Sequence, residues 1–374
     1  MNRKSFFTAI SALGAGIILL FQSAELSEGI RRGLSMCSYA VIPALFPFMA
    51  LSVFICKSSA ADFLEVILRP VTKLLKIPAC CGGVLLAAAI GGYPAAAKCM
   101  SDLVTEGKLS RSTAGRMLCY CVNAGPPFLI GAVGTAVFGD IKIGVMLFGA
   151  QAISSVLMAL ISAAFSKKPE ESSVLKLQRP GNAVCVVDSV ISAAESCFRM
   201  CAFIIIACGV FELLEVSAIF KFFGKSAAAK AVLSGIFEVT SGCMACGKIS
   251  GFSAVVIAGA LASFSGISVI LQVAAVTDGS GIPLTPFIFS RFAHAGITAA
   301  ILRIFLALPC DTVASFAVKG SHIDAVLSVS APAAVSLLCM AALFLLSLVP
   351  PKSEKEPLFV QLRYKFKNCK NFRL

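Results

Sequence analysis

The sequence predicts an all-α integral membrane protein, a polytopic helical bundle of about 8–10 membrane segments with two similar repeats and interrupted or re-entrant helices. The first observation is composition, since 58% of the residues are hydrophobic and only 14% are charged, against roughly 25% charged in a soluble domain. The second is spacing: uncharged runs such as 33–56, 117–139 and 249–277 reach the roughly 20 apolar residues of a membrane-crossing helix. The third is a pair of similar helix-breaking stretches far apart in the chain.

The amino-terminal membrane half is predicted to extend over 1–165. Its helices are expected near 5–23, 36–56, 79–98, 113–138 and 141–165, where charges are sparse. The basic start MNRK would suit a signal peptide, but no convincing cleavage site follows Phe21, so we favour a retained first helix. The stretch SAELSEGIRRG (23–33) is typical of a loop or an amphipathic connector.

A second membrane half is predicted over 186–350. Its helices are expected near 186–215, 228–247, 251–276, 282–307 and 325–349. The linker 166–185 contains prolines and a basic excess, and the tail 351–374 is strongly basic, so both are predicted to be cytoplasmic. These segments explain much of the net charge of +13, and we therefore expect a lipid bilayer rather than a nucleic acid as the partner.

Two pairs of interruptions recur in the same order in the two halves. Residues 91–100 read GGYPAAAKCM and residues 235–244 read GIFEVTSGCM, while NAGPPFLIGAV (123–133) faces FSGISVILQVA (264–274). Gly and Pro inside a span free backbone groups that lipid cannot satisfy, so broken helices occur where protein or a wet cavity supplies partners. Paired interruptions indicate a midplane binding site, although the same residues would also serve close helix packing.

Polar residues at these interruptions are the candidate binding residues. Glu238 follows an apolar stretch, and an acid inside a span is costly enough to require a cavity or a partner, unless it lies at the membrane surface. Lys98 would pair with that acid or attract an anionic group, or else extend to the headgroups. Asn123 can donate and accept hydrogen bonds at a broken helix, or simply cap one.

The polar residues of the later run share one helical face. Ser265, Ser268 and Gln272 are spaced by three and four residues, which favours a lined pathway or, alternatively, hydrogen bonds between helices. The full set of candidate substrate-binding residues is Tyr93, Lys98, Asn123, Glu238, Thr240, Ser241, Ser265, Ser268 and Gln272.

Other charged residues are interpreted as structural. Glu195 and Arg199 form an i,i+4 pair, and Arg291 and His294 lie one turn apart, so we interpret these four as members of structural ion pairs. No nucleophile–base arrangement or nucleotide-binding loop occurs, so we expect no catalytic residue and no enzymatic activity. The 16 cysteines lie mostly in apolar runs without zinc-ligand spacing, so we expect no metal and no cofactor.

At these motifs the chain resembles the YlbJ family of sporulation integral membrane proteins, which belongs to the Gate, or nucleoside-recognition, domain membrane proteins. The motifs occur in the family's order and cover nearly the whole chain. They are LFPF (45–48), GGYPAAAK (91–98), NAGPPFLIGAV (123–133), GIFEVTSG (235–242), SFSGISVILQV (263–273) and FSRFAHAG (289–296). This chain departs from the family pattern at GGYPAAAK, where SGYPxGAK is more usual, and at Ile270, where a histidine is usual. Ala-Gly also follows Asn123 where Thr-Ser is common.

The resemblance implies an architecture and a biological setting. It implies two Gate-like repeats, at about 45–165 and within 186–350, similar to the hairpin and broken-helix modules of concentrative nucleoside transporters. In that comparison Glu238 takes the place of the acid that contacts the nucleoside ribose, while Pro94 stands at the aligned position of the first repeat. The family further implies an endospore-forming bacterium and a role in making the spore.

These observations together predict a multi-pass protein of the bacterial cytoplasmic membrane, in the mother cell or the forespore, that is needed for the spore cortex or envelope. A transporter-like mechanism would move a small polar solute, such as a nucleoside-like metabolite, through a midplane cavity. The alternative is a non-transporting scaffold for other sporulation membrane proteins. A membrane enzyme acting on a lipid-linked cell-wall precursor would need a catalytic group that the sequence lacks.

Overall fold

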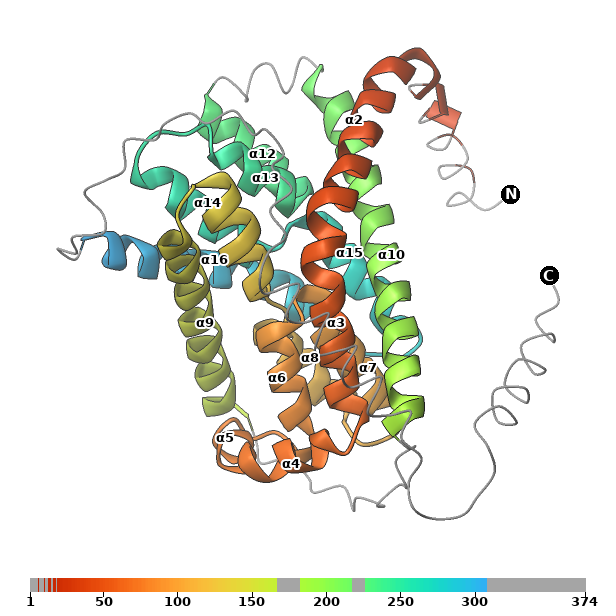
Figure 1. Cartoon of the computed structure of the whole chain (residues 1–374), viewed down its shortest axis with the longest axis vertical. Helices are drawn as coiled ribbons and strands as arrows, with labels where there is room; N and C mark the ends of the chain where they lie inside the picture. The colour runs from red at the N-terminus through yellow and green to blue at the C-terminus, as the bar shows by residue number, and fades with distance from the viewer. Residues whose placement is uncertain are drawn as a thin grey trace.

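The structure is a computed structural model that describes residues 19–166, 182–216 and 226–307, with a few isolated positions before residue 19. Its secondary structure within these ranges is helical throughout, without strands (Figure 1). Helices long and apolar enough to cross a membrane are Ile141–Ala164, Val184–Glu215, Phe252–Thr277 and Thr285–Ala307. Shorter apolar helices are Leu45–Lys57, Ala79–Ile90, Pro127–Val137 and Ala227–Phe237. The chain is therefore a polytopic helical membrane protein, which confirms the predicted fold class.

A long helical segment opens the described chain. It consists of α2 (Ser23–Met36), a π-helical turn at Cys37–Val41 and α3 (Ile42–Lys57), so the predicted connector 23–33 is itself helical. It packs along α10 (Asn182–Glu215), beside which α2 stands in Figure 1. A Cβ atom added to Gly29 of α2 would lie 2.6 Å from the carbonyl oxygen of Cys208 in α10. The two backbones therefore touch because small residues occupy the crossing.

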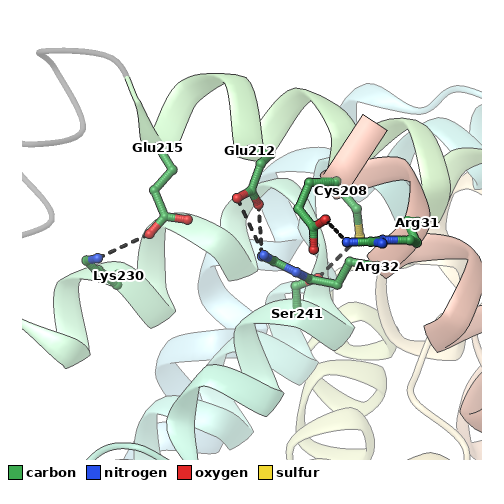
Figure 2. A network of polar contacts seen from close by, with 8 residues as sticks. Arg31, Arg32, Cys208, Glu212, Glu215, Lys230 and Ser241 are labelled. Carbon is green, nitrogen blue, oxygen red and sulfur yellow. Dashed lines mark hydrogen bonds and ion pairs between the residues drawn. The ribbon is translucent and has the colours of Figure 1, made fainter. Parts of the chain in front are cut away.

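Ion pairs join α2 and α12 (Ala227–Phe237) to the end of α10 (Figure 2). Arg32 Nη1 lies 2.8 Å from Glu212 Oε2, and Lys230 Nζ lies 3.1 Å from Glu215 Oε1. Arg31, by contrast, pairs with Glu28 on its own helix. Of these three pairs, Arg32–Glu212 is the one that joins α2 to α10.

A double-mutant cycle of Arg32→Ala and Glu212→Ala should give a coupling free energy of about 0.5 kcal/mol, because the Arg32 side chain is half exposed and solvent screens the pair. The measurement is the free energy of unfolding in detergent. Arg31→Ala combined with Glu212→Ala is the matched control and should show additive effects, since their side chains are not paired. Equal coupling in both cycles would contradict the geometry.

Four of the segments that the sequence predicts as membrane helices each consist of two helices separated by an interruption. We call these four interruptions the breaks. The breaks lie at 91–92, 122–126, 238 and 265. They separate α6 (Gly82–Ile90) from α7 (Tyr93–Thr105), α8 (Arg111–Cys121) from the π-helix Pro127–Val137, α12 from α13 (Val239–Cys246), and α14 (Phe252–Phe264) from α15 (Gly266–Thr277). By contrast, α9 (Ile141–Ala164) and α16 (Thr285–Ala307) run without interruption.

The two predicted halves pack against each other along their helices. α10 contacts α2 and α3, α15 contacts α7, and α16 contacts α8 and α9. The short helices α4 (Ala60–Ile67) and α5 (Arg69–Leu74), which follow α3, have no counterpart in the predicted elements. These contacts bring broken helices of both halves together.

Several sequence predictions fall outside the described residues. They are most of the first helix (5–23), most of the linker 166–185, the helix near 325–349 and the tail 351–374. α10 begins at Asn182, four residues before its predicted start. The division of the chain into two membrane halves stays a prediction.

Candidate functional site

In each half the two breaks meet backbone to backbone. A Cβ atom added to Gly125 would lie 3.2 Å from the amide nitrogen of Gly92. In the second half, a Cβ atom added to Gly266 would lie 2.9 Å from the carbonyl oxygen of Gly235 and 3.2 Å from the amide nitrogen of Val239. Both halves thus use glycine to let one broken helix touch the other.

A hydrogen bond also joins the break regions of the two halves. Tyr93, the first residue of α7, donates from its hydroxyl to the carbonyl oxygen of Ala262, at 2.7 Å, in the last turn of α14. Helix ends leave carbonyl groups without a partner inside the helix, and lipid supplies none. Tyr93 is buried. Its hydroxyl therefore supplies the Ala262 carbonyl oxygen with a donor in a place that solvent does not reach.

Ser265 occupies an unusual backbone conformation. Its φ of 77° lies in the left-handed region, and Gly266 follows with φ 73°. Such a conformation costs a residue other than glycine on the order of 1 kcal/mol and is often found at functional sites. The strain marks the fourth break as a place where the backbone is held out of helical geometry.

A small cavity of about 20 Å³ lies where the broken helices meet. Its lining residues come from both halves: Val41, Leu45, Gly92, Tyr93, Gly125, Phe128, Met200, Ile204, Glu238, Val239, Thr240, Val269 and Gln272. This volume holds about one water molecule. The cavity is therefore too small to hold a solute of metabolite size.

Glu238 contributes the charged group of the cavity. It is 1% exposed, so the protein itself surrounds the carboxylate. Its carboxylate caps α13 by accepting hydrogen bonds from the amide nitrogens of Thr240, at 2.9 Å, and Ser241, at 2.6 Å. The Glu238 side chain thus closes the start of α13 from inside the cavity wall.

Several buried polar atoms near Glu238 are not hydrogen-bonded. Gln272 lines the cavity, and its Oε1 has no hydrogen-bond partner among the described residues, nor do the hydroxyls of Ser265 and Ser268. Each of these three residues is at most 3% exposed. Since buried polar groups are nearly always hydrogen-bonded, this cluster indicates a place for water or a polar ligand.

The remaining candidates lie away from the cavity wall. Lys98 Nζ pairs with Asp102 Oδ1, at 2.6 Å, one turn along α7, and does not pair with Glu238. Asn123 donates to the carbonyl oxygen of Tyr120 at 2.8 Å, while its Oδ1 has no partner within the described ranges. Ser241 Oγ lies 3.5 Å from Cys208 Sγ in α10.

The ion-pair interpretation holds for one pair and is wrong for the other. Glu195 and Arg199 are paired at 2.6 Å. Arg291, although fully buried, donates to the carbonyl oxygens of Val122, at 2.7 Å, and Cys119, and His294 Nε2 lies 3.3 Å from Ser155 Oγ. The physical reason is that the end of α8 offers carbonyl groups with partial negative charge, which the sequence pattern did not reveal.

Sequence reasoning missed the apolar part of the wall. Val41, Leu45, Met200 and Ile204 line the cavity from the first helical segment and from α10, and no polar or helix-breaking signal distinguishes them from lipid-facing residues. Within the described residues, no group of three or more His, Cys, Asp or Glu side chains is placed to hold a metal ion.

No protein-family model and no solved structure matches the chain. The chain is similar to the sporulation integral membrane protein YlbJ of Bacillus subtilis (strain 168), with 26% identity over 321 residues. The match covers 76% of this chain and 78% of that protein. This similarity over most of both chains agrees with the resemblance to the YlbJ family of sporulation integral membrane proteins that the sequence motifs indicate.

Proposed function

We propose that this protein is a carrier rather than an enzyme, and that it moves a small polar solute across a membrane of the sporulating cell. The observation that carries the proposal is the buried group formed by Glu238, Thr240 and Gln272 in a cavity lined by both halves. A buried acid, and an amide oxygen that has no partner among the described residues, are costly in a membrane. A polar solute that donates hydrogen bonds would satisfy the amide oxygen and interact favourably with the acid.

Binding and release require the cavity to open. About 20 Å³ is far below the several hundred Å³ of a pocket for a small molecule. Transporters built from repeats open such sites by movement of one group of helices against another. Here the helix ends at the breaks border the cavity, so a change at the glycine contacts between them would alter its volume directly.

The resemblance to Gate-domain proteins supports a nucleoside-like metabolite as the first solute to test. The proposed setting is the mother-cell or forespore membrane, where transport would serve formation of the spore cortex or envelope. Other sporulation membrane proteins are the proposed partners if the protein instead acts as a scaffold.

The test is thermal stabilisation of the purified protein by a metabolite panel that includes nucleosides. A ligand present at 100 times its dissociation constant adds about 2.7 kcal/mol to the stability of the folded state. Gln272→Leu should leave the stability of the ligand-free protein unchanged or slightly higher, because the Gln272 Oε1 has no partner to lose. The same variant should weaken or abolish the stabilisation by the solute.

Lys98→Ala is the matched control, because Lys98 pairs with Asp102 outside the cavity wall. It should keep the response of the unaltered protein. A solute that stabilises all three proteins equally would bind elsewhere, and a panel without any stabilising solute would favour the scaffold.

A further inference from the structure

Arg291 makes contacts that bridge distant parts of the chain. It lies in α16 and is 0% exposed. Its guanidinium donates from Nη1 to the carbonyl oxygen of Val122, at 2.7 Å, and from Nη2 to that of Cys119. The guanidinium carbon also lies 4.8 Å from the ring centroid of Phe287. One side chain thus binds two carbonyls that precede it by about 170 residues.

The two carbonyls belong to the end of a broken helix. α8 ends at Cys121, and Val122 has extended backbone, so the carbonyls of the last turn are not used by a following helical turn. The carbonyl end of a helix carries about half a negative charge, and inside a membrane no lipid group can satisfy it. A buried cation with a forked set of donors suits this position, since a guanidinium binds two oxygens at once.

The segment beyond these carbonyls forms part of the cavity. Residues 122–126 are the second break, and Gly125 both lines the cavity and touches Gly92. Gln151 of α9 supports the same segment by donating to the carbonyl oxygen of Ala124 at 3.4 Å. Two uninterrupted helices, α16 and α9, therefore bind the second break through hydrogen bonds from their side chains.

We infer that Arg291 is a positioning residue, a cation tethered to α16 that holds the carbonyl end of α8 and thereby fixes the second break as a wall of the cavity. It does not line the cavity itself. The inference concerns the construction of the break and stands whether or not the protein carries a solute.

The native Cys121 allows a direct test. It adjoins the break and is 1% exposed, while Cys243 in α13 is 0% exposed and belongs to the other half. Labelling of the full-length protein in detergent with a maleimide, followed by mass spectrometry of peptides, measures opening at each site separately. Arg291→Ala should raise the labelling rate of Cys121 by about ten-fold, equivalent to about 1.4 kcal/mol of local opening. Cys243 should keep its rate.

Chemical rescue distinguishes a tethered cation from general packing. Guanidinium ion at a sub-denaturing concentration should restore protection of Cys121 in Arg291→Ala. Arg199→Ala, which removes an exposed arginine paired with Glu195, is the control and should leave both cysteines protected. Arg291→Lys keeps the charge but cannot reproduce the fork, so it should show a smaller rise at Cys121.

Three results would overturn the inference. Unchanged labelling of Cys121 in Arg291→Ala would show that the break does not depend on Arg291. An equal rise at Cys121 and Cys243 without rescue would show loss of the whole fold instead of local release. If Arg291→Ala does not accumulate in the cell, Arg291→Lys provides the test. Protection of Cys121 in Arg291→Lys as strong as in the unaltered protein would contradict the need for both hydrogen bonds from the guanidinium to the carbonyls of α8.

Discussion

Replacing Glu238 with alanine should lower the free energy of unfolding by about 4 kcal/mol, because it leaves two buried backbone donors without an acceptor and each costs about 1–3 kcal/mol. The donors are the amides of Thr240 and Ser241, which the carboxylate now accepts at 2.9 Å and 2.6 Å. Glu238 is 1% exposed, so the cap lies away from bulk water. The measurement is thermal or denaturant unfolding of the purified protein in detergent.

Two milder variants separate the cap from a role in binding a solute. Glu238→Asp keeps a carboxylate at the N-cap position of α13, where aspartate is a favoured residue, and should cost less than about 1 kcal/mol. Glu238→Gln offers one oxygen for two donors and should fall between aspartate and alanine. If the alanine variant is as stable as the unaltered protein, the cap is not important for the fold. If the aspartate variant is stable but no longer responds to a stabilising solute, Glu238 also contacts that solute.

Replacing Gly242 with alanine should destabilise the protein by about 3 kcal/mol, at the upper end of what overpacking usually costs. A Cβ atom at this position would lie 2.2 Å from the Cα atom and 2.6 Å from the amide nitrogen of Gly235. Both contacts are with backbone, so no side chain can rotate away. α12 and α13 would have to separate, and the third break lies between them. Thermal unfolding and the yield of folded protein measure the effect.

The matched control is Gly149→Ala in α9. A Cβ atom there would meet no atom within 4 Å, and alanine favours a helix over glycine by up to about 1 kcal/mol. This variant should be as stable as the unaltered protein or more so. Equal losses from Gly242→Ala and Gly149→Ala would mean that the closeness of α12 and α13 is not what limits stability.

The sequence predicted the broken helices because the causes of the breaks are local. Gly91 and Gly92 interrupt the first helix, and AGPP prevents the helix of Asn123 from continuing, so both breaks follow from backbone chemistry. The short helices α4 and α5 were missed because they are too short to give a membrane-length apolar run. Which break contacts which other break depends on packing between segments far apart in the sequence, and a local sequence pattern does not predict such packing.

The candidate site was predicted in part for the same reason. Glu238 and Gln272 stood out because buried polar groups are rare in apolar runs, and the structure places both at the cavity. The two partners differ in this respect. The pairing of Lys98 with Asp102 follows the readable i,i+4 spacing and was overlooked, whereas the binding of Arg291 to carbonyls of α8 could not be predicted. Every residue has a backbone carbonyl, so the amino-acid sequence does not identify which one an arginine binds. An arginine that binds a carbonyl therefore cannot be distinguished by sequence from one that pairs with a carboxylate.

The small volume of the cavity has a consequence for the energy balance of the membrane. With room for about one water molecule, the site cannot hold a file of waters along which protons would pass. This cavity therefore gives protons no chain of waters along which to cross the described part of the protein. For the carrier that we propose, the movements that open such a site would take microseconds to milliseconds, so its flux would fall far short of that of an open pore.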